Sequence, residues 1–504
     1  MDCTKIPPCV LVIFGGTGDL THRKLIPALY NLKYQNWLPE NFAVVSIGRR
    51  NKTDDEYRKE AWDSVGKYSR FELNEKMWGE ISNNLYYKKV DFEDGKDYEA
   101  LKVFLKGIES DKGTEGNIIF YLAVAPEFFE TIITNLHENG MVNADGPSWQ
   151  RVVIEKPFGS SLKSARDLNR KIAQVFNEKN TFRIDHYLGK EMVQSIMNVR
   201  FANSLFEPLW NNKYIDNIQI SSCETIGIEN RGEYYEKAGA LGDMIQNHML
   251  QILALVAMEP PAGTSAESIR DEKVKVLGSI KEFTPEVVAG DIVFGQYSEG
   301  ETEAGTVVGY RQENKVSPDS KTESYAAIKI QIDNPRWEGV PFYIRTGKRL
   351  AEKTTDIVVQ LKMPANAVNM EESSGYEPNL IVIRIQPKEE LFIRFNTKKP
   401  GILGQICPVK MNYCQKCRTC ELQTNSPEAY EKLIYDVING DSTLFTRWDE
   451  VEKSWSIIET IKDSKGSKAL SFPNYKPGTW GPDEADELLK RDGRHWWNTV
   501  TKGS

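Results

Sequence analysis

The chain has 504 residues, of which 40% are hydrophobic and 27% charged, and its formal net charge at neutral pH is -8. This length exceeds one ordinary domain, so two or three domains of a soluble globular protein are expected. The negative charge argues against nucleic acid or an anionic membrane as the main partner. No signal peptide or transmembrane span is recognised, so we expect a soluble, cytoplasmic protein without membrane partners.

The N-terminal region reads as a strand, a glycine turn and a helix. Residues 9–14 (CVLVIF) form a buried-type strand that runs into GGTGDL at 15–20, and a helical stretch follows at 24–33. Glycines in such a turn let the backbone approach a pyrophosphate, and the helix start offers N–H groups to it. The spacing G-x-x-G-D-L is less specific than G-x-G-x-x-G, so a tight turn without a ligand stays an alternative for this motif alone.

A second strand, FAVVSIG at residues 42–48, is followed by Arg49 and Arg50. An NAD site usually places an acidic residue near this position to hold the ribose 2′-hydroxyl. Guanidinium groups instead suit a 2′-phosphate, which accepts forked hydrogen bonds from arginine. The pair therefore predicts a preference for NADP. Two solvated surface arginines are the alternative, and the commoner fate of such a pair in general.

Strands and helices continue to alternate up to about residue 180. Further helices are predicted at about 54–66, 97–108 and 127–139, and further strands near 86–90, at 117–124 and at 151–159. This alternation predicts a parallel, doubly wound sheet whose ligands lie at the carboxyl ends of its strands. Lys156 in EKPFG lies at such an end, and a cis peptide bond before Pro157 would direct the lysine.

The pattern changes after residue 180. Helices are predicted at about 191–203, 233–258, 426–445 and 447–463, and strands at 214–227, 326–332, 341–347, 356–363, 380–387 and 391–398. They indicate a large, mostly antiparallel sheet with helices on one face and an open face that could form an oligomer interface. The expected architecture is a Rossmann-type dinucleotide-binding domain at 1–180 and an α+β substrate-binding, catalytic and oligomerisation domain at 181–504.

The long helix at 233–258 contains an unusual group of polar residues before an apolar continuation. They are Asp243, Gln246, Asn247 and His248. Burying so many polar groups is costly unless they face a site or a partner. Given a carboxylate partner that raises its basicity, His248 is a candidate general base for oxidising an alcohol. The alternative is a histidine that is satisfied within a helical core.

A second polar stretch, FRIDHYLGKE at 182–191, surrounds another of the five histidines. If a helix begins near His186, then His186 and Lys190 lie on one face of it, four residues apart. These side chains and the Tyr187 hydroxyl at a helix start would suit a phosphate. Asp185 is then a candidate carboxylate partner for His248. The alternative is an amphipathic turn with local charge pairs.

GGTGDL, EKPFG, FRIDHYLGKE and DMIQNHMLQ together resemble the glucose-6-phosphate dehydrogenase family. The similarity extends from residue 9 to the ADEL segment at 485–488, and FRIDHYLGK is its most specific motif. The resemblance implies an NADP-dependent oxidation of D-glucose 6-phosphate at C1 to 6-phosphogluconolactone, the entry step of the oxidative pentose phosphate pathway. It also implies a homodimer or homotetramer, since family members form both.

The resemblance implies a role for individual residues as well. His248 matches the general base and Asp185 the carboxylate that pairs with it. The residues that match the holders of the sugar phosphate are His186, Tyr187, Lys190 and Lys353. Those that match contacts to the sugar are Lys156, Glu224, Asp243, Lys348 and Gln386. Those that match the coenzyme site are Gly15, Thr17, Gly18, Asp19, Leu20, Arg49 and Lys156, and Pro157 matches a cis-proline.

Two features depart from the family pattern. Some members hold a second, structural NADP with basic residues where this chain reads Lys353-Thr354-Thr355-Asp356, so no structural NADP is expected here. The late cysteines have spacings that suit a tetrahedral metal site in a knuckle-like loop, with free thiols in a surface loop as the alternative. They are Cys407, Cys414, Cys417 and Cys420. Whether they bind a metal stays undecided.

Two other functions are weighed against this one. A two-domain sugar oxidoreductase that acts on an unphosphorylated sugar is disfavoured by the group His186, Tyr187 and Lys190. A catalytically inactive NADP-binding regulator is disfavoured by the presence of Asp185 and His248. The ratio of NADP to NAD use stays open, because some family members also use NAD.

Overall fold

The computed structural model describes residues 6–143, 146–302, 305–364, 376–401, 405–414, 425–465 and 470–499. The chain divides into two compact units. Unit 1 comprises Met1–Lys190, Gly263–Arg270 and Asn425–Glu452, and unit 2 comprises Glu191–Ala262, Asp271–Thr424 and Lys453–Ser504. This division differs from the predicted boundary at residue 180, because unit 1 continues to Lys190 and takes in two later segments.

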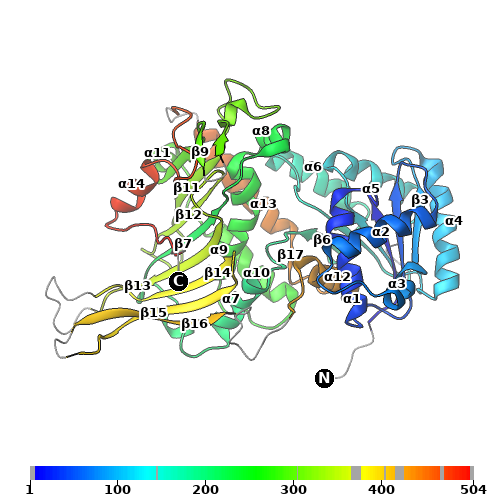
Figure 1. Cartoon of the computed structure of the whole chain (residues 1–504), viewed down its shortest axis with the longest axis horizontal. Coiled ribbons are helices and arrows are strands. Elements are labelled where there is room, and N and C mark those ends of the chain that lie inside the picture. Colours follow the sequence, from blue (N-terminus) through cyan, green and yellow to red (C-terminus); the bar gives the residue numbers. More distant parts are fainter. Residues whose placement is uncertain are drawn as a thin grey trace. The chain divides into compact units, whose positions relative to one another are not determined.

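Unit 1 is built on a seven-stranded sheet in the order β17-β6-β5-β4-β1-β2-β3 (Figure 1). Its parallel strands are β1 (Cys9–Phe14), β2 (Phe42–Gly48), β3 (Leu85–Lys89), β4 (Ile118–Leu122), β5 (Gln150–Ile154) and β6 (Thr181–Ile184). Their order is that of a doubly wound dinucleotide-binding fold, so the predicted parallel sheet is confirmed. β17 (Phe445–Thr446) pairs antiparallel with β6 and brings a late segment into this unit.

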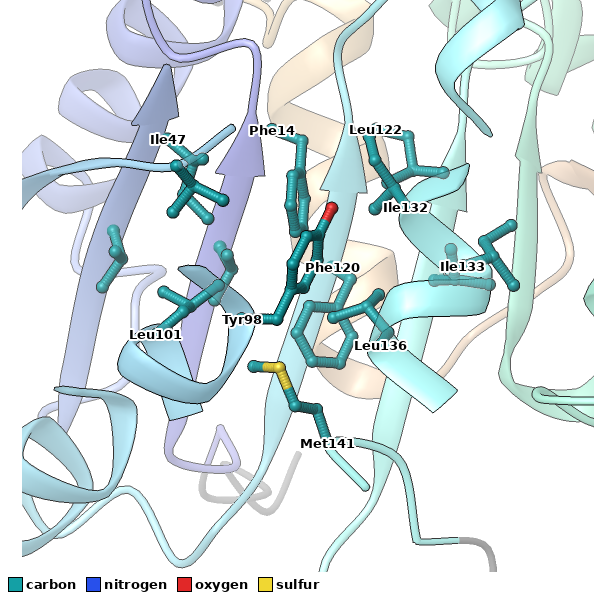
Figure 2. Packing of buried hydrophobic residues seen from close by; sticks show 14 of the residues in the cluster. Phe14, Ile47, Tyr98, Leu101, Phe120, Leu122, Ile132, Ile133, Leu136 and Met141 are labelled. Carbon is teal, nitrogen blue, oxygen red and sulfur yellow. The ribbon is translucent and has the colours of Figure 1, made fainter. Parts of the chain in front are cut away.

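Helices connect these strands. They are η1 (Thr21–Leu25), α1 (Ile26–Tyr34), α2 (Asp54–Tyr68), α3 (Glu75–Ser82), α4 (Gly95–Lys112), η2 (Pro126–Phe128), α5 (Phe129–Glu138), α6 (Leu162–Ala173), η3 (Glu178–Asn180) and, later in the chain, α12 (Ala429–Asn439). Figure 2 shows side chains of β1 and β4 packed with those of α4 and α5, and the ring of Tyr98 stacks on Phe14 with centroids 6.2 Å apart. Each Å² of apolar surface buried in this way contributes about 25 cal/mol. This packing holds the carboxyl ends of the strands in place.

Two predicted elements of unit 1 differ from the structure. The helix predicted at 426–445 ends at Asn439, because Gly440 adopts the left-handed conformation (φ 75°) that terminates helices. No helix begins at His186, since residues 186–189 form turns and α7 (Glu191–Phe201) begins later. The argument that placed His186 and Lys190 on one helix face is therefore wrong.

Unit 2 contains an eight-stranded sheet in the order β16-β15-β14-β13-β7-β12-β11-β8 (Figure 1). The strands are β7 (Ile215–Cys223), β8 (Ile292–Gly295), β11 (Tyr325–Ile330), β12 (Phe342–Gly347), β13 (Thr354–Leu361), β14 (Leu380–Gln386), β15 (Glu390–Lys398) and β16 (Ile406–Cys414). Only the β7–β12 pair among them is parallel, so the predicted mostly antiparallel sheet is confirmed. A separate small hairpin consists of β9 (Gly300–Thr302) and β10 (Gly305–Val307).

Helices cover one face of this sheet, where α7 packs on β14 and η6 on β12. Besides α7, the helices are η4 (Glu207–Leu209), η5 (Glu229–Arg231), α8 (Gly232–Ala240), η6 (Leu241–Met249), α9 (Leu250–Ala257), α11 (Pro285–Asp291), η7 (Tyr310–Gln312) and α14 (Glu484–Lys490). Two more, α10 (Ala266–Gly278) and α13 (Trp448–Lys465), run through segments of both units. No element was predicted where α14 lies. No helix in the described part of the chain is long and apolar enough to cross a membrane.

The second face of the sheet is not open at its centre, contrary to the prediction. Gln219 of β7 donates to the His495 carbonyl oxygen (2.8 Å) and accepts from the Trp497 N–H (2.9 Å). The C-terminal segment covers these strands because its backbone satisfies polar side chains that point from the sheet. Near the β16 edge, Met411 and Tyr413 stay exposed, as an open face predicts.

Candidate active site

The GGTGDL turn joins β1 to η1 in unit 1, and it is packed too closely for side chains at its first glycines. A Cβ at Gly15, which has φ 92°, would lie 2.2 Å from the Ala123 carbonyl oxygen. A Cβ at Gly16 would lie 2.7 Å from the Ser46 Cβ. The helix that starts at Thr21 supplies N–H groups that have no intrahelical partner. A close backbone beside a helix start is what the phosphates of a dinucleotide require.

The rest of the turn is closed by a backbone hydrogen bond and lies close to β2. The Gly18 N–H donates to the Gly15 carbonyl oxygen at 2.9 Å, and a Cβ at Gly48 of β2 would lie 3.4 Å from the Thr17 side chain. Asp19 is exposed and pairs with Arg23 at 3.6 Å, and Leu20 directly precedes η1. The predicted coenzyme residues thus form one continuous turn at the carboxyl end of β1.

Arg49 follows β2 directly, at the same edge of the sheet. It is exposed, and its guanidinium carbon lies 5.6 Å from the centroid of the Phe128 ring in η2, which follows β4. Arg50 is also exposed, and its carbonyl oxygen accepts a hydrogen bond from the Tyr87 hydroxyl at 2.7 Å. Ligands of doubly wound folds bind at the carboxyl ends of the strands. Arg49 therefore lies at the edge of the sheet where such ligands bind.

Glu155 and Lys156 follow β5 at this edge too, and the Lys156–Pro157 peptide bond is cis, as predicted. The Tyr121 hydroxyl donates to Glu155 Oε1 at 2.6 Å, and Tyr430 of α12 is hydrogen-bonded to the same carboxyl group. Burial raises the pKa of Glu155 to about 7, although these hydrogen bonds lower it. Next to Lys156 there is thus a carboxyl group that changes charge near neutral pH.

The FRIDHYLGKE stretch leaves β6 through turns that bring its polar side chains together. Asp185 and Tyr187 are buried, and the Tyr187 N–H donates to Asp185 Oδ1 at 2.9 Å. Lys190 Nζ lies 3.9 Å from the centroid of the Tyr187 ring, and the His186 ring packs edge-on against it at 5.1 Å. The turn is tight against α12, since a Cβ at Gly189 would lie 3.0 Å from the Ala429 side chain. Turns, and not a helix, gather the predicted phosphate-binding trio.

His248 belongs to unit 2 and lies on η6, a π-helix that interrupts the predicted continuous helix at 233–258. Gly239, with φ 61°, breaks the helix just before η6. Asp243 and His248 are buried, His248 to 1% exposure, and the His248 N–H donates to Asn247 Oδ1 at 2.7 Å. π-Helices are rare and occur frequently at functional sites. The polar composition of this helix therefore coincides with an irregular backbone.

A buried ion-pair cluster lies beside Asp243 in unit 2. Lys348, which is 2% exposed, pairs with Glu224 and lies 3.5 Å from Asp243 Oδ2. The Tyr234 hydroxyl donates to Asp243 Oδ1 at 3.2 Å. Glu224 and Lys348 follow the parallel strands β7 and β12, which is why they meet. Two carboxylates and an ammonium group can accept from and donate to the hydroxyls of a sugar.

The two other predicted residues of unit 2 lie elsewhere on its sheet. Gln386 ends β14, and its Nε2 donates to Thr355 Oγ1 of β13 at 2.8 Å. Lys353 is exposed and precedes β13 directly. In the register of β13 with β14, Gln386 lies opposite Thr355, which comes two residues after Lys353. Gln386 and Lys353 therefore lie near the same end of β13.

Two of the late cysteines, Cys407 and Cys414, lie near opposite ends of one strand. Cys407 is a free thiol near the start of β16, and Cys414 ends the same strand. Seven residues of extended chain separate their backbones by roughly 23 Å, too far for one tetrahedral ion. Cys417 and Cys420 lie outside the described residues.

Four residues that support the site were missed from the sequence. They are Tyr121, Tyr234, Glu323 and Tyr430. None of them lies in one of the recognised motifs, so the sequence carried no signal for them. They became visible only through their contacts with Glu155, Asp243 and Leu241.

The fold and the glycine turn of unit 1 define a protein with a dinucleotide-binding domain, the class that includes the nicotinamide-dependent oxidoreductases. The family models for "Glucose-6-phosphate dehydrogenase, NAD binding domain" and "Glucose-6-phosphate dehydrogenase, C-terminal domain" match residues 12–195 and 197–497. The chain belongs to the glucose-6-phosphate dehydrogenase family.

Relatives of similar length support this assignment. Glucose-6-phosphate 1-dehydrogenase of Bacillus subtilis (strain 168) is 46% identical over 499 residues, which cover 99% of this chain and 100% of the relative. That of Chlamydia pneumoniae is 46% identical over 497 residues, covering 97% of this chain and 96% of the relative.

Solved structures agree with the sequence comparison. A glucose-6-phosphate dehydrogenase in complex with its substrate glucose-6-phosphate has a TM-score of 0.88 and 32% identity, covering 99% of this chain and 100% of that chain. Glucose-6-phosphate 1-dehydrogenase from Mycobacterium avium has a TM-score of 0.82 and 32% identity, with the same coverage.

Proposed function

We propose that this enzyme oxidises D-glucose 6-phosphate at C1 with NADP, giving 6-phosphogluconolactone and NADPH. The observation that carries the proposal is the 46% identity, over 99% of the chain, to a relative named glucose-6-phosphate 1-dehydrogenase. The similar structure that was solved with glucose-6-phosphate supports the same substrate. From this similarity we also infer a homodimer or homotetramer in the cytoplasm.

His248 is the proposed general base, and Asp185 is the carboxylate proposed to pair with it. The base removes the proton of the anomeric hydroxyl, so that the C1–O bond becomes the carbonyl of the lactone as C1 loses a hydride. NADP supplies the hydride acceptor when it is bound. A carboxylate at the imidazole fixes its tautomer and stabilises its protonated form. The burial of His248 supports this role, because a base shielded from bulk water acts on a bound substrate.

The substrate is proposed to be held at both of its ends. The phosphate would be bound by His186, Tyr187, Lys190 and Lys353. The packing of His186 and Lys190 against the Tyr187 ring supports this assignment. The residues proposed to contact the sugar hydroxyls are Lys156, Glu224, Asp243, Lys348 and Gln386. The pairs of buried Lys348 with the partly exposed Glu224 and the buried Asp243 support an assignment to a polyhydroxyl ligand.

The coenzyme is proposed to lie on the glycine turn. Its pyrophosphate would contact the backbone at Gly15, Thr17, Gly18, Asp19 and Leu20, with Lys156 nearby. Arg49 would bind the 2′-phosphate, which makes NADP the preferred coenzyme. The exposure of Arg49 at the carboxyl end of β2 supports this assignment.

The test is a kinetic assay of the purified protein with glucose 6-phosphate and NADP, followed at 340 nm. NADPH should form rapidly with this sugar, and much more slowly with unphosphorylated glucose. His248→Asn should lower kcat by about 10²- to 10⁴-fold while the sugar phosphate still binds. His137→Asn, at an exposed histidine of α5, serves as the matched control and should keep wild-type kcat.

Each part of the proposal can fail separately. Tight NADP binding without any NADPH formation would overturn the activity in favour of a regulator. Equal rates with glucose and glucose 6-phosphate would overturn the phosphate site. If His248→Asn keeps most of its turnover, His248 is not the base.

A further inference from the structure

The break in the helix at Gly239 is built around a single side chain, that of Glu323. A Cβ at Gly239 would lie 2.2 Å from Glu323 Oε1, and the backbone there has φ 61° and ψ -176°. The Leu241 N–H donates to Glu323 Oε1 at 3.1 Å, and the Ala240 N–H donates to the Glu323 carbonyl oxygen at 3.0 Å. One residue therefore accepts from two N–H groups at the start of η6, where a negative charge also stabilises a helix.

Glu323 is itself held firmly. Its side chain is buried, and its carboxylate pairs with Lys465 of α13. Such a buried, paired carboxylate has few orientations open to it, so it defines where the first turn of η6 lies.

The residue that follows Glu323 connects the same segment to the ion-pair cluster. The Ser324 carbonyl oxygen accepts from the Lys348 N–H at 3.0 Å. The Tyr475 hydroxyl lies 2.9 Å from Ser324 Oγ and donates to the Lys348 carbonyl oxygen at 2.8 Å. Two adjacent residues thus hold the start of η6 on one side and the backbone of Lys348 on the other.

We propose that Glu323 is a positioning residue for the reaction: by anchoring the start of η6, it sets Asp243 beside Lys348 and orients His248. The proposal rests on the function proposed above for His248. Glu323 contacts the first residue of η6 although 82 positions separate it from Leu241 in sequence. Glu323 acts on the geometry of η6 and does not itself contact the substrate.

The test compares variants at Glu323 with a matched control. Glu323→Ala should lower kcat at least tenfold and raise the KM for glucose 6-phosphate several-fold, while the dissociation constant for NADP stays within twofold. Glu323→Gln should restore kcat to within about threefold of wild type, because its amide oxygen still accepts from the Leu241 N–H. Glu390→Ala is the control, since Glu390 is also buried and ion-paired in unit 2 but lies on β15.

A second measurement does not depend on activity. Amide hydrogen exchange over residues 240–249 should be faster in Glu323→Ala than in wild type, and unchanged in Glu390→Ala. Faster exchange in a protein without glucose-6-phosphate dehydrogenase activity would refute the proposed function and not the anchoring of η6. Wild-type kcat in Glu323→Ala, an equal loss of kcat in Glu390→Ala, or unchanged exchange over η6 would overturn the positioning role.

Discussion

Lys348 Nζ lies 3.5 Å from Asp243 Oδ2 and also pairs with Glu224, which is 124 positions earlier in the chain. Lys348 and Asp243 are buried in unit 2 and Glu224 is 24% exposed, so the ammonium group lies between a buried and a partly exposed carboxylate. The parallel pairing of β7 with β12 places Glu224 and Lys348 side by side, and η6 adds Asp243. The cluster is thus a product of strand register and of one irregular helix.

Removal of the Lys348 charge should disable this cluster. In Lys348→Met two carboxylates face each other without a cation, so we expect kcat/KM for glucose 6-phosphate to fall by about 10²-fold or more, the effect of losing a buried charge pair of roughly 3 kcal/mol. Steady-state kinetics would measure this change. Lys329→Met is the control. Lys329, on β11, also forms an ion pair, with Asp492 at 2.7 Å, but that pair is not part of this cluster. Similar losses in both variants would show that the effect is one of general folding.

Arg49 should determine the choice between coenzymes. In Arg49→Gln the charged hydrogen bonds to a 2′-phosphate are lost, so we expect KM for NADP to rise by about 10- to 100-fold and KM for NAD to change little. Arg166→Gln is the control, because Arg166 forms a surface pair with Glu452 on the same unit. An equal rise of KM for both coenzymes would contradict a 2′-phosphate role.

Glu155 should make the stability of the protein depend on pH. Its folded-state pKa is raised from 4.5 to about 7, so between these values the folded protein holds a proton that the unfolded chain has lost. The free energy of unfolding therefore falls as pH rises from about 4.5 to 7 and levels off above 7.

The neutral variant Glu155→Gln removes this pH dependence. Its free energy of unfolding relative to that of wild type should therefore rise by roughly 3 kcal/mol between pH 4.5 and pH 7. Urea unfolding at pH 5 and pH 8 would measure the difference. Glu138→Gln, at an exposed position on α5, controls for the loss of a surface charge. A Glu155→Gln variant with the wild-type pH dependence would mean that Glu155 ionises as in the unfolded chain.

Glu431 should be a main attachment of α12 within unit 1. It is fully buried, accepts from Arg70 at 2.7 Å and accepts from Asn31 Nδ2 at 2.9 Å. Glu431→Ala leaves the buried Arg70 charge without a carboxylate, with only the neutral acceptors Gln35 and Asn425, so the free energy of unfolding measured in urea should fall by about 3–5 kcal/mol. Lys24→Ala removes an exposed pair with Glu428, the residue directly before α12, and should cost less than about 1 kcal/mol. Equal losses would contradict the importance of burial.

Much of unit 1 follows from patterns that span a dozen residues. Buried strands that alternate with helices predicted a parallel sheet, and Gly15 lies where a turn with positive φ requires a glycine. In unit 2, alternating segments predicted the antiparallel strands, because side chains on a half-buried strand repeat every two residues. The candidate site residues were likewise predicted from short motifs and from the family resemblance that these motifs carry.

Other features depended on contacts between distant residues. The sequence suggested a helix start at His186 and an unbroken helix through Gly239, since local patterns allow both. The structure has turns at His186 because they pack against α12, which comes more than two hundred positions later. It has a break at Gly239 because Glu323 occupies the space where a side chain would lie.

The sequence by itself determined the elements, the glycine turn and the motifs, because backbone sterics and burial periodicity act over short stretches of chain. Only the tertiary structure decided that Lys348 meets Asp243, that Tyr121 and Tyr430 enclose Glu155, and that the C-terminal segment covers the sheet of unit 2. Buried charges and polar groups need partners. Which partners they find depends on the path of the whole chain, and no local pattern records that path.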